Sequence, residues 1–196
     1  LQYSGTDNYS HTGLNANTKY YYKIWSYDGS NYSSGVEFNG TTLKGEPTDH
    51  VTGFSATASS FDQVDLSWTD ASGTTPPDGY LIKANNTGTG DFSHPNDGTD
   101  PSEDSDLSDG SALVHVSQGE ESYFFTGLNE TTQYYFKIWP YTNSGSDIDF
   151  KADETVPTDN ATTEETPAIE INEIHADPDA TNGDANGDGT VDSGDD

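Results

Sequence analysis

The sequence predicts an all-β fold built from antiparallel β-sandwiches. Three observations point to it: a repeated segment, short runs in which apolar and polar residues alternate, and turn residues between those runs. The chain contains 12 tyrosines and is 12% aromatic, although only 29% of its residues are hydrophobic. A disordered acidic chain would lack these aromatic residues, whereas the thin core of a sandwich uses them.

The repeat consists of two segments near the two ends of the chain. Thr12–Tyr27 reads TGLNANTKYYYKIWSY and Thr126–Tyr141 reads TGLNETTQYYFKIWPY, and eleven of the sixteen positions are identical. Side chains within each copy alternate with period two, which is the period of a β-strand. Each copy is therefore expected to form a turn followed by a strand.

More strands are expected between the two copies. Four runs have period-two alternation or strand-like composition and are bounded by turn residues: Val51–Ala58, Gln63–Thr69, Gly79–Ala84 and Ser122–Phe125. No segment shows a sustained helical period. Several short strands separated by polar turns are typical of an antiparallel sandwich.

These residues resemble the fibronectin type III family. Trp68 stands where the family has the core tryptophan of its second strand. Leu128 followed by Tyr134 resembles the family's tyrosine corner, in which the phenol packs in the core and its hydroxyl caps a backbone group. Leu14 and Tyr20 repeat that spacing. The resemblance implies tandem immunoglobulin/fibronectin-III-like antiparallel β-sandwiches, with partial modules at both ends.

Three regions follow from this organisation. Residues 1–44 are expected to be the last strands of one fibronectin-III-like domain, and residues 45–163 a complete domain with an acidic insertion at about 86–121. Residues 164–196 are expected to be a linker and the start of another module. Half a sandwich cannot bury its apolar face alone, so residues 1–44 would need strands from a longer chain or from another subunit.

The acidic insertion has two interpretations. It contains nine acidic residues and no lysine or arginine. The simpler interpretation is a solvated, mobile surface loop. The alternative is a cation site, whose spacing matches no metal motif, formed by Asp97, Asp100, Asp104 and Asp106.

The segment from Asp184 to Asp195 has the spacing of a twelve-residue calcium loop. The residues at its ligand positions are Asp184, Asn186, Asp188, Thr190 (through its carbonyl), Asp192 and Asp195. Gly189 stands at the sharp turn, where a residue without a Cβ is needed. Asp195 departs from the glutamate of EF-hands and resembles the last position of a dockerin-type loop. We therefore predict calcium as a cofactor; the alternative is an acidic, glycine-rich disordered tail.

The end of the chain carries a second resemblance. The segment INEIHADPDATNGDANGDGTVDSGDD is similar to the opening of bacterial lamin-tail-like domains. These are immunoglobulin-like β-modules that often carry a dockerin-like insertion. The resemblance implies that the rest of that module lies beyond Asp196.

Composition argues against several functions. The chain has 35 acidic residues against six lysines and no arginine, for a formal net charge of −29, which excludes nucleic acid as an expected partner. No apolar run reaches the roughly 20 residues of a membrane helix. The five histidines lack zinc spacing, the chain has no cysteine, and no GxSxG motif occurs. We expect no catalysis from these residues.

Aromatic residues also lie on the strand face turned away from the expected core. In the second copy they are Tyr135, Trp139 and Tyr141, and in the first copy Tyr21, Trp25 and Tyr27. If exposed, such a row could stack on sugar rings and form a glycan site. The alternatives are packing around the aliphatic part of Lys137 or Lys23, or contact with a neighbouring module.

The expected function is that of an extracellular structural or spacer region, or a cell-surface interaction region, of a secreted bacterial protein that is stabilised by calcium. Its expected partners are neighbouring modules of the same chain, with other subunits or surface polysaccharide as further possibilities. Three alternatives remain at this point: an accessory region of a secreted hydrolase or nuclease, a carbohydrate-binding adhesin, and a protomer of a surface filament.

Overall fold

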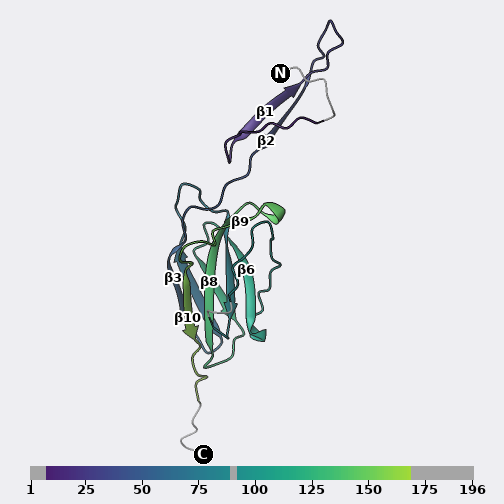
Figure 1. The fold of residues 1–196 in the computed structure, drawn as a ribbon. Helices are drawn as coiled ribbons and strands as arrows, with labels where there is room; N and C mark the ends of the chain where they lie inside the picture. The colour runs from purple at the N-terminus through teal and green to yellow at the C-terminus, as the bar shows by residue number, and fades with distance from the viewer. Residues whose placement is uncertain (1–7, 89–91, 169–196) are drawn as a thin grey trace, which may run out of the picture. The chain divides into compact units, whose positions relative to one another are not determined.

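The fold was obtained as a computed structural model that describes residues 8–88 and 92–168 (Figure 1). The six predicted calcium ligands between Asp184 and Asp195 lie outside the described residues. The chain divides into two compact units, residues 1–165 and 166–196. The domain limits proposed from the sequence stay a prediction. Among the described residues, no helix is long and apolar enough to cross a membrane.

The described residues form strands and two short 3-10 helices. Strands β1 and β2 form a hairpin of their own, and the elements from β3 to β10 form a sandwich. In chain order the elements are β1 (Lys19–Ile24), β2 (Val36–Thr41), β3 (Thr52–Ala58), β4 (Gln63–Thr69), β5 (Gly79–Asn85), η2 (Leu107–Asp109), β6 (Ser111–Ser117), β7 (Ser122–Thr126), β8 (Gln133–Thr142), η3 (Gly145–Asp147), β9 (Asp149–Phe150) and β10 (Thr158–Thr162).

Two antiparallel sheets make the sandwich (Figure 1). One has the order β3-β4-β7; the other has the order β10-β8-β5-β6, with β9 paired to β8. The predicted all-β class and antiparallel architecture are confirmed, and the four predicted runs correspond to β3, β4, β5 and β7. Strand β6 falls inside the expected insertion and pairs along its length with β5, so the irregular part of the insertion ends before Ser111.

The core lies between these sheets because period-two alternation turns one side of every strand inward. Trp68 of β4 is 4% exposed and packs edge to face on Tyr80 of β5, with 5.8 Å between ring centroids. The prediction of a core tryptophan at this position is confirmed. Three alternate residues of β8 have no exposed surface at all: Tyr134, Phe136 and Ile138.

A tyrosine corner closes the turn before β8. The Asn129 backbone N–H donates to the Tyr134 hydroxyl over 3.0 Å, and Leu128 is buried beside it. The turn needs a left-handed backbone at Thr131, where φ is 49°. The predicted corner geometry is confirmed.

Alkaline pH is expected to unfold the sandwich through its buried tyrosines. Burial raises the pKa of Tyr80, and the hydrogen bond donated by the Ala71 N–H offsets only part of this increase. Burial also raises the pKa values of Tyr123 and Tyr141. A raised folded-state pKa means that the stability contribution is complete below the unfolded pKa, about 10, and is lost as pH rises through the folded value.

Urea denaturation at a series of pH values checks this expectation. The free energy of unfolding should fall with pH from about pH 10 upward. Tyr80→Phe should make that decline shallower, because one of the titrating groups is gone. An equally steep decline in the variant would contradict the assignment to Tyr80.

Candidate functional site

The candidate glycan residues lie on the outer face of the five-stranded sheet that contains β8. Tyr135, Trp139 and Tyr141 belong to β8 and alternate with the core residues of that strand. Leu81 of the neighbouring strand β5 shares this face and is fully buried. The face therefore carries an apolar cluster of its own, separate from the core between the sheets.

Trp139 is 0% exposed. Two rings of the insertion cover its indole: Phe92 at 6.5 Å and His94 at 6.1 Å between centroids, both in edge-to-face geometry. The same buried cluster also contains Ile148, Phe150 and Val156. The expectation of a solvent-exposed aromatic row is wrong at Trp139, because the chain's own insertion occupies the surface that a sugar ring would need.

The two tyrosines of the row are half-buried. The Tyr135 hydroxyl donates to Gln133 Oε1 over 2.8 Å. The ring of Tyr141 meets His115 at 5.5 Å and Phe150 at 5.8 Å. Both side chains are also packed against the buried cluster on this face.

Lysines complete the packing around Trp139. The ammonium groups of Lys83 and Lys137 lie 5.5 and 5.3 Å from the indole centroid, within the range of a cation–π contact. Lys83 also donates to the Ser93 carbonyl over 2.8 Å, and burial lowers its pKa. On this face the aromatic row therefore packs around Lys137, which was the alternative to a glycan site.

Carboxylates attach the insertion to the sheet. Asp97 accepts a hydrogen bond from the Phe150 backbone N–H over 2.8 Å. Asp100 accepts one from the Gly145 N–H over 3.0 Å, and Glu103 one from the His115 N–H over 3.1 Å. The interpretation as a merely solvated loop is wrong for these residues, because part of the negative charge of the insertion caps backbone donors.

The four aspartates of the alternative cation site do not converge. Asp104 accepts from the Asp106 N–H, and Asp106 in turn caps η2 through the Ser108 N–H. Within residues 8–88 and 92–168, no group of three or more histidine, aspartate or glutamate side chains is arranged to hold a metal ion. The predicted calcium loop lies outside these ranges and stays a prediction.

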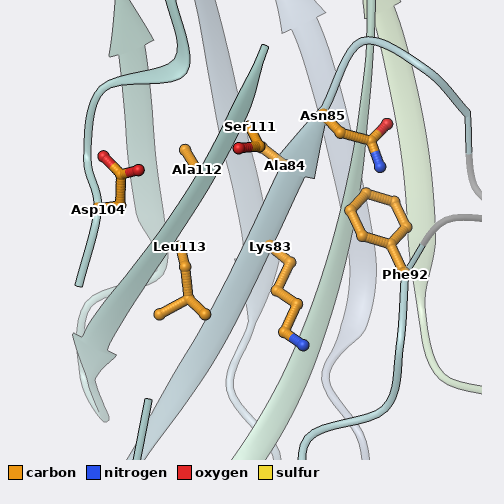
Figure 2. A pocket seen from close by; sticks show the side chains of 8 residues that line it. All are labelled: Lys83, Ala84, Asn85, Phe92, Asp104, Ser111, Ala112 and Leu113. Atoms are coloured by element: carbon orange, nitrogen blue, oxygen red, sulfur yellow. The ribbon is translucent and has the colours of Figure 1, made fainter. Parts of the chain in front are cut away.

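A shallow depression of about 260 Å³ lies beside this covered face (Figure 2). Lys83 and Leu113 line it from the paired strands β5 and β6, and Phe92 from the insertion. One polar group at its edge is already engaged, because Asn85 Oδ1 accepts from the N–H groups of Thr87 and Gly88. Asp104 and Ser111 also line the depression.

The covering role of Phe92 was missed from the sequence. The signal that could have shown it is compositional: Phe92 is the one phenylalanine, tyrosine or tryptophan between residues 86 and 110 of the insertion. A single large apolar residue in an otherwise polar segment indicates an anchor. Its partner on β8 is far away in sequence, so local periodicity could not identify that partner.

Comparison with known proteins gives similarity at the level of fold. No family model and no curated protein matches the chain. The three fibronectin domains of chicken CNTN1 (FN1–FN3) are 17% identical, with a TM-score of 0.44, over 78% of this chain and 44% of that one. An fn3 domain of human contactin 1 is 17% identical, with a TM-score of 0.41, over 72% and 100% of the two chains.

A third solved structure, an fn3 domain of the human collagen alpha-1(XX) chain, is 12% identical, with a TM-score of 0.40, over 73% of this chain and 99% of that one. The fibronectin-III-like fold of the sandwich itself follows from the strand order, the core tryptophan and the tyrosine corner.

Proposed function

We propose that this chain is an extracellular structural or interaction region of a secreted bacterial protein, in which the fibronectin-III-like sandwich acts as a rigid spacer without catalytic activity. The observation that carries the proposal is the complete burial of Trp139 under the insertion. A sheet that is covered on both faces is stiff and offers little concave surface to a small ligand. The neighbouring modules of the same polypeptide are its proposed partners.

Charge supports an exposed, solvated location. The net charge is −29, and three of the six lysines are used in ion pairs with carboxylates: Lys23–Glu37 at 2.8 Å, Lys44–Asp78 at 2.6 Å and Lys151–Asp153 at 2.6 Å. The remaining acidic surface keeps copies apart and attracts divalent cations. Both properties suit a spacer in a medium that contains calcium.

Labelling of intact cells tests the location. An antibody against the folded sandwich should stain intact cells or detect the protein in the culture medium. Staining only of permeabilised cells, together with the absence of the protein from the culture medium, would contradict an extracellular role.

Calcium binding at Asp184–Asp195 is part of the same proposal. It is supported by the six oxygen donors at loop spacing and by a glycine at the sharp turn. The loop would stiffen the region that follows the sandwich. It would also give that region a stability that depends on the calcium concentration.

Calcium is expected to raise the free energy of unfolding of the loop-bearing unit by about 2.7 kcal/mol at a hundredfold excess over the dissociation constant. Calorimetry of the chain in calcium and then in chelator measures this shift. The matched variant Asp188→Ala should lose the calcium response and leave the melting of the sandwich unchanged. A transition that is the same in calcium and in chelator, with no calcium bound in equilibrium dialysis, refutes the calcium site.

A further inference from the structure

The β1–β2 hairpin reproduces the last hairpin of the sandwich down to individual hydrogen bonds. The Asn15 N–H donates to the Tyr20 hydroxyl over 2.9 Å, as the Asn129 N–H donates to the Tyr134 hydroxyl over 3.0 Å. The hairpin therefore contains a complete tyrosine corner.

The second strand of the hairpin is tied in the same way as β10. Thr42 Oγ1 accepts from the Thr18 N–H over 2.9 Å, and Thr163 Oγ1 accepts from the Thr132 N–H over 3.0 Å. The registers agree as well: the pairs Tyr20↔Gly40 and Tyr21↔Asn39 correspond to Tyr134↔Ala161 and Tyr135↔Asn160. Strands β1 and β2 are thus equivalent to β8 and β10.

The two hairpins differ in what covers them. Ile24 is 63% exposed, whereas its equivalent Ile138 is 0% exposed. Trp25 is 49% exposed, against 0% for Trp139. In the sandwich the inner face of β8 is covered by the β3-β4-β7 sheet, and one edge of β8 pairs with β5. A two-stranded hairpin is at best marginally stable alone, so the face of β1–β2 requires a cover.

A second copy of this chain does not provide that cover. Two hairpins face to face, each with two six-residue strands, would bury roughly 200 Å² per partner, far below the about 800 Å² of a standard interface. Exchange of the hairpin into the sandwich of another copy also fails. Each copy brings one set of strands β3 to β7 and two hairpins, so one hairpin per copy would always stay uncovered.

The residues before the hairpin indicate the direction from which the cover comes. Tyr9 and Thr12 coincide with Tyr123 and Thr126 of β7 when the two copies are aligned. The turn that follows begins with a left-handed glycine in both copies, with φ of 75° at Gly13 and 73° at its equivalent. The chain thus leads through this turn into β1 in the same way as it leads from β7 into β8.

An aromatic contact supports this equivalence. His11 occupies the place of Phe125, and its ring lies 5.9 Å from that of Tyr22. Phe125 lies 5.7 Å from Phe136, the residue equivalent to Tyr22. Residues 8–12 form no strand themselves, but they correspond in sequence and in this ring contact to the end of β7.

We propose that the exposed face of β1–β2 is the docking surface for a half-sandwich that precedes Asn8 in the same polypeptide and supplies strands equivalent to β3, β4, β5 and β6. Its β5-like strand runs antiparallel along the free edge of β1. By the register of the sandwich, it places an apolar residue opposite Trp25, as Leu81 stands opposite Trp139. Its β4-like strand pairs with residues 8–12 and buries Ile24.

Amide hydrogen exchange in two chains tests this docking. One chain is the 196-residue protein, and the other carries residues 46–121 directly ahead of Asn8, in place of residues 1–7. We expect the amides of β1 to exchange at least tenfold more slowly in the extended chain. Ile24→Asp in the extended chain is the matched control and should restore fast exchange in β1 while β8 stays protected.

Three results of the exchange experiment would overturn the proposal. The first is an unchanged rate for β1 in the extended chain. The second is slow exchange of β1 in the 196-residue chain at low concentration, because the face would then already be covered. The third is protection that increases with the concentration of the 196-residue chain, which would assign the cover to a second copy.

The coding sequence upstream of Leu1 gives an independent check. It should encode two period-two strands with a tryptophan in the first, spaced like Trp68 and Tyr80 of the sandwich. An upstream sequence without such strands would overturn the docking proposal. Neither test depends on calcium or on cellular location, so a failure here is distinguishable from a failure of the proposed function.

Discussion

Ile138→Asp is expected to unfold the sandwich. Ile138 is 0% exposed in the core between the two sheets, where a carboxylate would find apolar neighbours. Burying an unpaired charge costs several kcal/mol, on the order of 4 or more in such a position. Circular dichroism and urea denaturation should show a large loss of stability or no cooperative transition at all.

Ile24→Asp is the matched control because it changes the same position of the repeat. Ile24 is 63% exposed, so its replacement is expected to alter the stability of the sandwich by no more than about 0.5 kcal/mol. Equal losses from the two substitutions would contradict the difference in burial on which this prediction rests.

Trp139→Ala is expected to lower the free energy of unfolding by about 3–5 kcal/mol. The substitution removes the ring on which Phe92, His94 and two lysines pack, and so it leaves a cavity under the insertion. Urea denaturation measures the loss of stability. Limited proteolysis should show faster cleavage near Phe92 than in the parent chain, because the anchor of the insertion is lost.

Trp25→Ala separates this effect from a general effect of losing tryptophan. Trp25 occupies the equivalent repeat position and is 49% exposed, so the sandwich should melt almost unchanged. If Trp139→Ala also left stability and proteolysis unchanged, the insertion would not be held by the outer-face cluster.

The strands and the tyrosine corner could be predicted because they depend on local pattern. The run Gln63–Thr69 has the same limits as β4, since Val64, Leu66 and Trp68 alternate with polar residues. The spacing of Leu128 and Tyr134, through its resemblance to a tyrosine corner, predicted that the hydroxyl caps a backbone group, and that group is the Asn129 N–H. These features involve residues that are close in sequence.

Strand β10 and the covered outer face could not be predicted in the same way. Strand β10 reads TDNAT and lacks apolar alternation; its place is set by pairing with β8 and by the buried Thr163 that follows it. Trp139 is on the predicted face, but periodicity does not show that Phe92 closes over it. Both depend on contacts between distant segments.

The repeated segment shows which features local sequence decides and which features tertiary contacts decide. Eleven identical positions out of sixteen were enough to set the turn and the corner hydrogen bond in both copies. Burial was decided by tertiary structure alone: Trp139 is 0% exposed and Trp25 is 49% exposed, although their local sequences nearly coincide. Backbone geometry depends on neighbouring residues, whereas burial depends on what packs against the side chain.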